Sequence, residues 1–445
     1  MIQARDPFDN PLTLHNEASA AAMTGFVDGL IGYRPSILAV LGAAESDDSL
    51  VVQTCAAVVW LFSESPVGRP RARAHLARAR AAALPATERE RQLASAVAQW
   101  LAGEVYDAIA SFEAIVRQHP RDLVAIKLGQ YLAFNLGDSP TMLRLALHAL
   151  PGAADVPALH GLLAFGWEQC HRLHEAEAAA RQALAMQPAE PWSQHALGHV
   201  MLTDGRLAEG TNLLRQMSGG WSGLTSFMRC HLWWHLALFQ IELGDDAAAL
   251  QLYDEQVWGV DKTYSQDQVG AVSLLARLEL AGVAVADRWA ELAGWLLPRV
   301  RDQEQPFLDL QYLYGLARAG LAQADTLLAN IEAFAPGAPS ATRVAWQQVA
   351  VPAARGLRAH ARGRWAEAAD QLALALPGLA SIGGSHAQRD LFEQVHLDAL
   401  RRSGRLAAVQ NLLQPRANAQ PQSLRLPRQL HEVYAALGLP APAHH

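Results

Sequence analysis

The order of apolar and polar residues along the chain predicts a series of paired helices separated by glycine turns. Each unit has a helix-length stretch rich in apolar side chains, a glycine turn, a second such stretch and, often, a proline. Proline ends a helix because it has no N–H to donate. Gly103, Gly137 and Gly205 are 34 and 68 residues apart, and the missing middle turn falls at His171. The pattern therefore predicts an array of helical hairpins.

The unit from 157 to 188 shows the pattern most fully. Ala164 precedes its turn, Ala176 and Ala183 follow it, and Pro188 closes it. Small side chains at these places let the two helices approach closely. A period of about 34 residues is that of tetratricopeptide repeats, whose helix pairs stack into a superhelix.

Later turns continue the array with a looser period. We expect an all-α, tetratricopeptide-like solenoid of about nine helix pairs, with Ser385 and Gln388 forming a capping box at the start of a late helix. We expect three segments of one continuous solenoid: a helical cap (1–85), regular repeats (86–260), and looser repeats with a C-terminal capping helix (261–445). The later turn glycines are Gly244, Gly282, Gly320, Gly363 and Gly404.

Composition limits the classes of partner. Apolar residues make up 51% of the 445 residues and charged residues 18%, which is enough to bury a core. The net charge of −7 is spread along the chain, so we expect neither nucleic acid nor a membrane as a partner. The N-terminus does not resemble a signal peptide, and no apolar run is long enough to span a bilayer. Three cysteines without a paired framework favour a reducing, cytoplasmic location.

Two histidine pairs are the main chemical signal. His195/His199 and His231/His235 each have i,i+4 spacing, which puts both imidazoles of a pair on one helix face. In tetratricopeptide arrays the first helix of each pair lines the concave surface. Counting back from each turn, the repeat type implies that these histidines converge on one hollow, with Glu168 from the preceding unit. We therefore expect any catalytic chemistry to use these five residues.

The same counting places further side chains toward the hollow, including Glu242. Aromatic rings there could stack on a flat or apolar ligand, although packing between helices is the alternative for the tryptophans. The lysine could meet a ligand carboxylate or remain a solvated charge. The candidate ligand-binding residues are Lys127, Tyr131, Phe165, Trp192 and Trp234.

Three interpretations of the histidines stay open at this stage. Paired imidazoles can hold a divalent metal ion, with Glu168 as a possible carboxylate ligand, although no HExxH motif is present. An imidazole near neutral pKa also suits proton transfer, with a carboxylate to orient it. The third interpretation is that the histidines are buried packing or pocket residues bonded to their neighbours.

Several motifs resemble the tetratricopeptide repeat protein 38 family. They are LLAFGWEQ (162–169), PWSQHALGHV (191–200), DGRLAEG (204–210), HLWWHLALF (231–239), ALQLYDEQ (249–256) and IGGSHAQRDLFEQ, which begins at Ile382. The resemblance implies a cytosolic helical solenoid and no settled reaction. The chain departs from the family pattern at Gln130, Tyr131, Leu202, Gly270, Ala276 and Gln311.

Two classes of function follow. The first is a solenoid whose histidine-, tryptophan- and glutamate-lined hollow binds a small molecule. The second is an enzyme that uses the histidine cluster for metal-dependent or acid–base chemistry on a small substrate. A peptide- or protein-binding scaffold is a further alternative, but peptide grooves of this kind usually carry several basic residues, and this hollow has one lysine. A homodimer is possible, and the identity of any cofactor is open.

Overall fold

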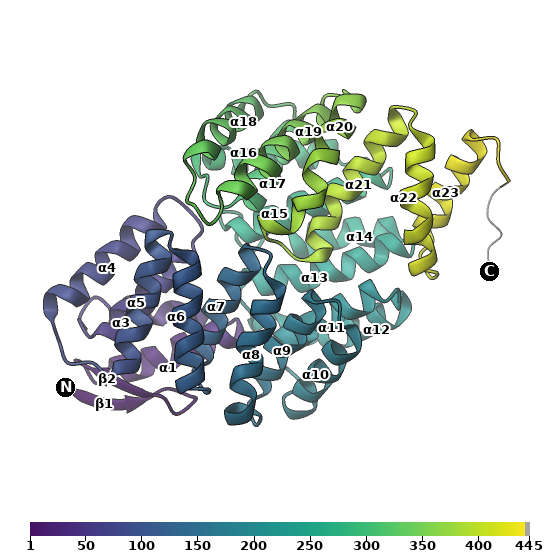
Figure 1. Ribbon diagram of the computed structural model, residues 1–445. Coiled ribbons are helices and arrows are strands. Elements are labelled where there is room, and N and C mark those ends of the chain that lie inside the picture. Colours follow the sequence, from purple (N-terminus) through teal and green to yellow (C-terminus); the bar gives the residue numbers. More distant parts are fainter. Residues whose placement is uncertain (441–445) are drawn as a thin grey trace. The chain divides into compact units, whose positions relative to one another are not determined.

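The protein is almost entirely helical. The computed structural model describes residues 1–440 and contains two short strands and a long series of helices in that part of the chain. None of the helices in this range is both long and apolar enough to cross a bilayer. The helices, labelled in Figure 1, are α1 (Ser19–Gly32), α2 (Ala39–Ala43), α3 (Leu50–Leu61), α4 (Gly68–Ala82), α5 (Glu88–Ala102), α6 (Val105–Gln118), α7 (Leu123–Asn135), α8 (Ser139–Ala153), α9 (Pro157–Gln169), α10 (Leu173–Met186), α11 (Pro191–Thr203), α12 (Leu207–Met217), α13 (Ser226–Glu242), α14 (Asp246–Leu252), α15 (Ser265–Leu280), α16 (Ala286–Leu296), α17 (Pro306–Arg318), α18 (Gln323–Phe334), α19 (Val351–Ala361), α20 (Trp365–Ala375), α21 (His386–Arg402), α22 (Leu406–Ala419) and α23 (Arg425–Ala436).

The chain divides into two compact units. The first comprises Met1–Ala196 and Gly220–Met228, and the second comprises Leu197–Gly219 and the chain from Arg229 onward. The division falls within α11 and α13, each of which is a continuous helix. The segments 1–85, 86–260 and 261–445 expected from the sequence remain a prediction.

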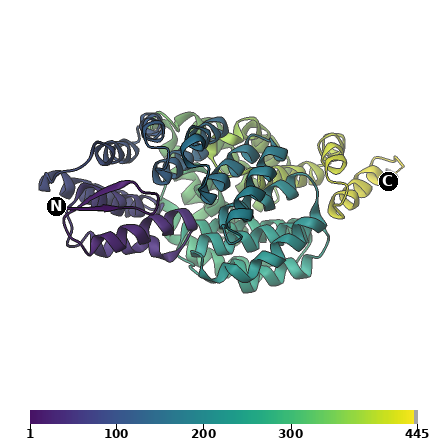
Figure 2. The ribbon, with the colours of Figure 1, turned by 90° about the horizontal axis from the view of Figure 1, so that it is seen from below.

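The first unit begins with a β-hairpin that the sequence pattern did not reveal. Strands β1 (Ile2–Arg5) and β2 (Pro11–Leu14) pair antiparallel, with Ile2 opposite Leu14 (Figure 2). The backbone N–H of Thr13 donates to Glu90 Oε1 at 2.7 Å, which ties β2 to α5. Two strands of four residues are too short for an alternating pattern to stand out from a loop.

The rest of the first unit is built from successive helical hairpins. Figure 1 shows α5 to α10 as neighbours in chain order. Asp122 begins α7, because its carboxylate accepts the backbone N–H of Ala125. The buried guanidinium of Arg89, on α5, lies 2.7 Å from the same carboxylate. A buried ion pair of this kind destabilises strongly if one partner is removed, so Asp122 fixes both a helix start and the register between hairpins.

The turn residues predicted from the sequence are confirmed. All eight predicted turn glycines have positive φ, between 70° and 97°. His171, which stands where the repeat lacks a glycine, has φ 57°. This left-handed conformation suits glycine because a Cβ is strained there. The capping box of Ser385 and Gln388 at the start of α21 is also confirmed.

In the second unit, α12 and α13 approach closely at a glycine, which has no side chain. A Cβ on Gly210, in α12, would lie 2.4 Å from Cζ of Phe239, in α13, which is closer than real Cβ atoms come. The fully buried Phe239 ring therefore fills the space that glycine leaves. From α15 to α22 the hairpins continue, and a continuous apolar core runs from Trp234 to Val395.

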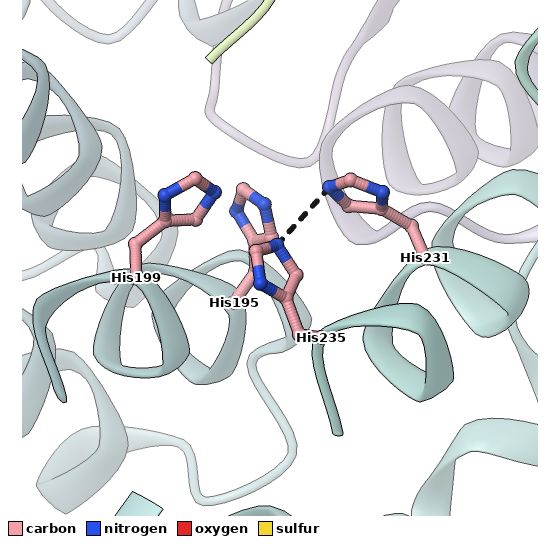
Figure 3. Close-up of side chains that lie close together, drawn as sticks. All are labelled: His195, His199, His231 and His235. Carbon is pink, nitrogen blue, oxygen red and sulfur yellow. Dashed lines mark hydrogen bonds between the residues drawn. The ribbon is translucent and has the colours of Figure 1, made fainter. Parts of the chain in front are cut away.

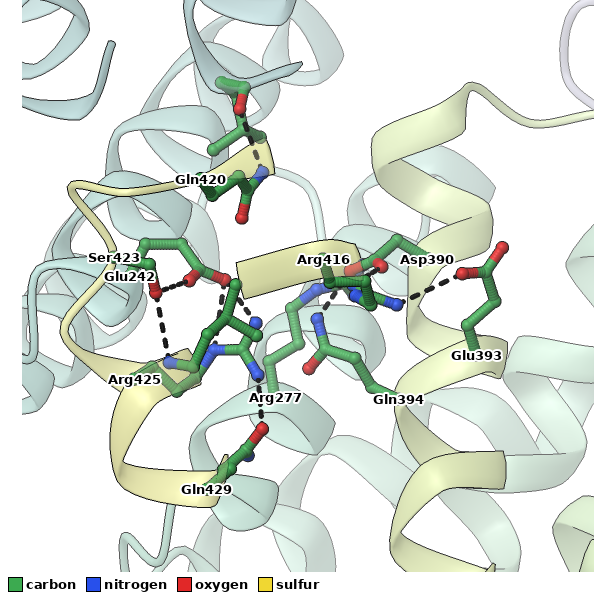
Figure 4. Close-up of polar contacts among 12 residues, drawn as sticks. Glu242, Arg277, Asp390, Glu393, Gln394, Arg416, Gln420, Ser423, Arg425 and Gln429 are labelled. Carbon is green, nitrogen blue, oxygen red and sulfur yellow. Dashed lines mark hydrogen bonds and ion pairs between the residues drawn. The ribbon is translucent and has the colours of Figure 1, made fainter. Parts of the chain in front are cut away.

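The C-terminal helix of the second unit closes back on α13. Glu242 accepts hydrogen bonds from Ser423 Oγ at 2.7 Å and from Arg425 Nη2 at 2.5 Å, and its carbonyl accepts the N–H of Leu424 (Figure 4). Counting back from the turn placed Glu242 toward the hollow. In the structure its carboxylate is bonded to Ser423 and Arg425 and holds the start of α23.

Candidate metal centre

Two histidine pairs lie on α11 and α13. His195 and His199 are one turn apart on α11, and His231 and His235 are one turn apart on α13 (Figure 3). All four are buried, with exposed fractions of 1%, 1%, 8% and 0% in chain order. The helical spacing predicted from the sequence is therefore confirmed, because each pair presents both rings from one face.

The four rings form one group. Each histidine offers one ring nitrogen, and these nitrogens all lie within 4.8 Å of one another. Nε2 of His231 and Nε2 of His235 are 3.2 Å apart and share a hydrogen bond. The ring centroids of His199 and His235 lie 4.4 Å apart in an edge arrangement. The predicted convergence of His195, His199, His231 and His235 is found in the structure.

Burial keeps the rings of α13 neutral. Desolvation lowers the pKa of His231 to about 3, with a smaller contribution from His199. The pKa of His235 is also lowered well below its ordinary value, first by burial and then by His199, His231 and Arg277. A neutral imidazole has a lone pair to donate, so these rings can bind a metal ion at neutral pH without first losing a proton.

The geometry is close to that of a metal site. Zinc–nitrogen bonds are about 2.0–2.1 Å long, so two nitrogens on one ion are at most about 4.2 Å apart. On a tetrahedral ion two such nitrogens are about 3.3 Å apart, so a pair at the observed limit of 4.8 Å would have to close by about 1.5 Å through side-chain rotation. An all-imidazole donor set suits zinc, copper and nickel better than magnesium or calcium. The four buried imidazoles fit this class of metal.

One histidine of each pair has a tryptophan ring stacked on it. Within the first unit, Trp192 lies 4.4 Å from His195, centroid to centroid, with 22° between the planes. Within the second unit, Trp234 lies 5.1 Å from His231, with 10° between the planes. The indole N–H of Trp234 is buried and has no hydrogen-bond partner among the described residues. Both tryptophans thus pack against a histidine ring, and their contact with a ligand stays a prediction.

The remaining predicted residues are distributed differently. Glu168 is fully buried and accepts from the Gln169 amide at 2.5 Å, and it is not a member of the four-histidine group. The ring of Phe165 packs 4.7 Å from Trp192. The Tyr131 hydroxyl donates to Glu64 at 2.8 Å, within an aromatic cluster of the first unit. Tyr131 therefore has a packing role in the structure.

Three residues near the predicted site were missed from the sequence. Tyr33, at the end of α1, stacks on Trp192 at 5.1 Å. Glu190 accepts the N–H groups of Trp192 and Ser193 at the start of α11. Arg277, on α15, lies 5.5 Å from the Trp234 ring centroid. Only Glu190 carried a local signal, as an acidic residue just before a helix; the other two are distant in sequence.

Comparisons with known proteins do not assign a family. No family model matches the chain. A structure of a human IFIT1 dimer with PPP-AAAA is 12% identical, with a TM-score of 0.39, covering 92% of this chain and 91% of that chain. A structure of Naa15/Naa10 bound to HypK-THB is 11% identical, with a TM-score of 0.26, covering 96% of this chain and 69% of that chain.

The class of protein follows from the helices and turns of the chain itself. The helical hairpins and their left-handed turn residues form an all-α solenoid of tetratricopeptide-like repeats. Within that class, the distinguishing feature is the buried group of four imidazoles.

Proposed function

We propose that the protein binds a late first-row divalent metal ion through His195, His199, His231 and His235, and that the ion anchors a small anionic molecule. The observation that carries this proposal is the mutual proximity of the four ring nitrogens, all within 4.8 Å. The sequence resemblance to the tetratricopeptide repeat protein 38 family is consistent with the proposal but supplies no reaction.

Charge supports an anionic ligand. Four neutral imidazoles leave the two positive charges of the ion uncompensated, and an uncompensated buried charge costs several kcal/mol. Arg277 adds a positive charge beside Trp234, and the acidic residue paired with it, Asp390, is 3.8 Å away. A carboxylate or similar group on the bound molecule would neutralise the ion. The Trp234 indole N–H could donate a hydrogen bond to it.

An open coordination position would make such a site chemically active. If three of the four histidines hold the ion, the fourth position is open to a substrate or water, which the ion polarises, and the remaining imidazole lies beside it. Metal-free acid–base chemistry is less suited to this site, because a ring with a pKa of about 3 is a weak base at neutral pH. A bound metal ion would therefore supply the polarisation of substrate or water that the imidazoles alone do not.

Cobalt titration tests the metal site directly. The purified chain, stripped with a chelator, is titrated with Co²⁺ and followed by its visible absorption. We expect one ion per chain and a tetrahedral spectrum. His231→Gln with His235→Gln should weaken binding at least about 100-fold, since each lost ligand costs several kcal/mol. His174→Gln, an exposed histidine, is the matched control.

A second titration tests the anion. Azide added to the Co²⁺ form should shift the absorption bands if a coordination position is open to small anions. Metal binding by the double variant equal to that of the natural chain, with both proteins folded, would overturn the metal site. A Co²⁺ spectrum that azide leaves unchanged would overturn the anchored-anion part alone.

A further inference from the structure

Lys127 is enclosed by aromatic rings in the first unit. Its Nζ lies 4.1 Å from the ring centroid of Tyr33 and 4.1 Å from that of Trp192. It also donates a hydrogen bond to the Tyr33 hydroxyl. The rings of Phe165 and Phe227 pack against these two aromatics, at 4.7 Å and 6.1 Å. The amine is therefore surrounded by flat apolar surfaces, with one hydroxyl within reach.

The choice of lysine at this position is unusual for this chain. Of its 36 basic residues only two are lysines, Lys127 and Lys262, and the rest are arginines. Arginine supplies a charge and stacks on aromatic rings as well as lysine does or better. An amine differs from a guanidinium chiefly in that it can lose its proton and act as a nucleophile. The position enclosed by aromatic rings thus carries an amine, which can act as a nucleophile, and not a guanidinium.

Burial disfavours the charged form of this amine, while the two ring faces at 4.1 Å offset part of that effect. Burial lowers the pKa of Lys127 to about 7, and Glu190 opposes the change only in part. The pKa of Glu190 is itself raised by burial, so its countercharge is weakened. The other lysine is held differently: Lys262 Nζ pairs with Glu291 Oε1 at 2.7 Å on the surface. The two lysines therefore differ in environment within one chain.

We propose that Lys127 is a nucleophilic amine that forms an imine with an aldehyde, and that aromatic aldehydes fit its surroundings best. The amine nitrogen adds to the carbonyl carbon, and the carbonyl oxygen takes up a proton. The resulting carbinolamine loses its hydroxyl with a further proton as water, leaving a C=N bond. Amine and aldehyde therefore give imine and water, with no oxidant or reductant.

Tyr33 is positioned to move the proton. Its hydroxyl already bonds to Nζ, so the same group lies within reach of the oxygen that must be protonated and expelled. The rings of Tyr33, Trp192 and Phe165 make the surroundings of the amine apolar, which suits an aromatic aldehyde better than a charged one. This inference does not depend on the metal proposal, because the imine step uses Lys127 and Tyr33, and neither belongs to the four-histidine group.

Reductive trapping tests the proposal. The folded chain is incubated with benzaldehyde and sodium cyanoborohydride at pH 7, and peptide mapping measures labelling at each lysine. With a pKa of about 7 instead of the usual 10.4, the neutral fraction of Lys127 is about 1,000-fold higher. Limited access and lower intrinsic nucleophilicity reduce this advantage. We expect Lys127 to be labelled at least ~10-fold faster than Lys262.

Matched variants separate chemistry from folding. Lys127→Arg keeps a cation over the rings and should remove this labelling without loss of the fold. Tyr33→Phe keeps the ring and should slow imine formation several-fold with little change in melting temperature. Lys262→Arg should change neither the labelling of Lys127 nor the melting temperature.

Three outcomes would count against the proposal. Labelling of Lys262 as fast as that of Lys127, or labelling of Lys127 only in denaturant, overturns the nucleophilic amine. Equal trapping rates in the natural chain and Tyr33→Phe overturn the assignment of Tyr33 as the proton donor.

Discussion

The Nε2 atoms of His231 and His235 lie 3.2 Å apart across one turn of α13. Two ligands on one tetrahedral zinc ion are about 3.3 Å apart when the bonds are about 2.05 Å long. Half of a metal site is therefore already at ligand spacing, with one shared hydrogen bond where the ion would sit. Entry of a metal would replace that bond with two bonds to the ion, and the backbone of α13 would not need to move.

The buried histidines should make stability depend on pH. An unfolded histidine has a pKa near 6.5, and folding lowers the pKa of His231 to about 3. Between these values the unfolded chain binds more protons, so the free energy of unfolding falls as the pH falls. Below pH 6.5 the loss is about 1.4 kcal/mol per pH unit for His231, with His235 adding to it in the same direction.

Urea unfolding without metal at pH 7.5, 5.5 and 4.5 measures this effect. The double variant His231→Gln, His235→Gln should show a shallower loss of stability than the natural chain over the same range. Other groups titrate equally in both proteins, so the difference between them isolates the two histidines. Parallel pH profiles would show that these rings are not held neutral by the fold.

Gly210 should be intolerant of a methyl group. Gly210→Ala would place a Cβ 2.4 Å from Phe239, and such overpacking typically costs about 1–3 kcal/mol. Gly270→Ala is the control: it is also helical, but its Cβ would have no atom within 4 Å. That variant should be stabilised by up to about 1 kcal/mol, because alanine is the better helix former. Thermal unfolding of both variants gives the comparison, and equal effects would contradict the packing argument.

His171 should gain stability on replacement by glycine. Its φ of 57° lies in the left-handed region, where a side chain costs about 1 kcal/mol. His171→Gly should therefore stabilise the chain by about 0.5–1 kcal/mol. The reverse change, Gly137→Ala at φ 72°, should destabilise it by a similar amount. Chemical denaturation midpoints of the two variants should move in opposite directions.

The turns show why the repeat fold was predictable from sequence. Glycine spacing reports a local backbone requirement, so even the irregular turn at His171 was identified correctly. The two histidine pairs were equally local, because i,i+4 spacing fixes the face on which each pair lies. Which helices meet follows from stacking in order, so neighbouring pairs could be expected to converge.

Contacts between distant segments were not predictable in this way. Nothing in the sequence near Glu242 indicates that Arg425, 183 residues later, would occupy its carboxylate. Tyr33 reaches Lys127 across 94 residues, from a helix end that repeats no motif. Tyr131 bonds to Glu64, and its ring joins a cluster with Phe62 and Trp100, which the sequence did not indicate; its contact with a ligand stays a prediction.

Glu242 should control how firmly the C-terminal helix is held. Its carboxylate accepts from Ser423 and Arg425, and both side chains of the Glu242–Arg425 pair are largely buried, at 11% and 12% exposed. Glu242→Gln removes the charge but keeps the size, leaving the Arg425 guanidinium without its counterion. Charge-assisted hydrogen bonds contribute about 1.5–3 kcal/mol. Most of that loss should appear as local opening of α23.

Limited proteolysis and hydrogen exchange measure this opening. In Glu242→Gln, cleavage after Arg425 and exchange of the Leu424 N–H should rise about tenfold or more, because this N–H donates to the carbonyl of Glu242. Glu432→Gln is the control, since it removes an exposed pair with Arg401 that should contribute less than about 1 kcal/mol. If both variants opened equally, the buried pair would not be what holds α23. If only Glu242→Gln opens, contact with α13 stabilises the C-terminal helix more than the surface pairing does.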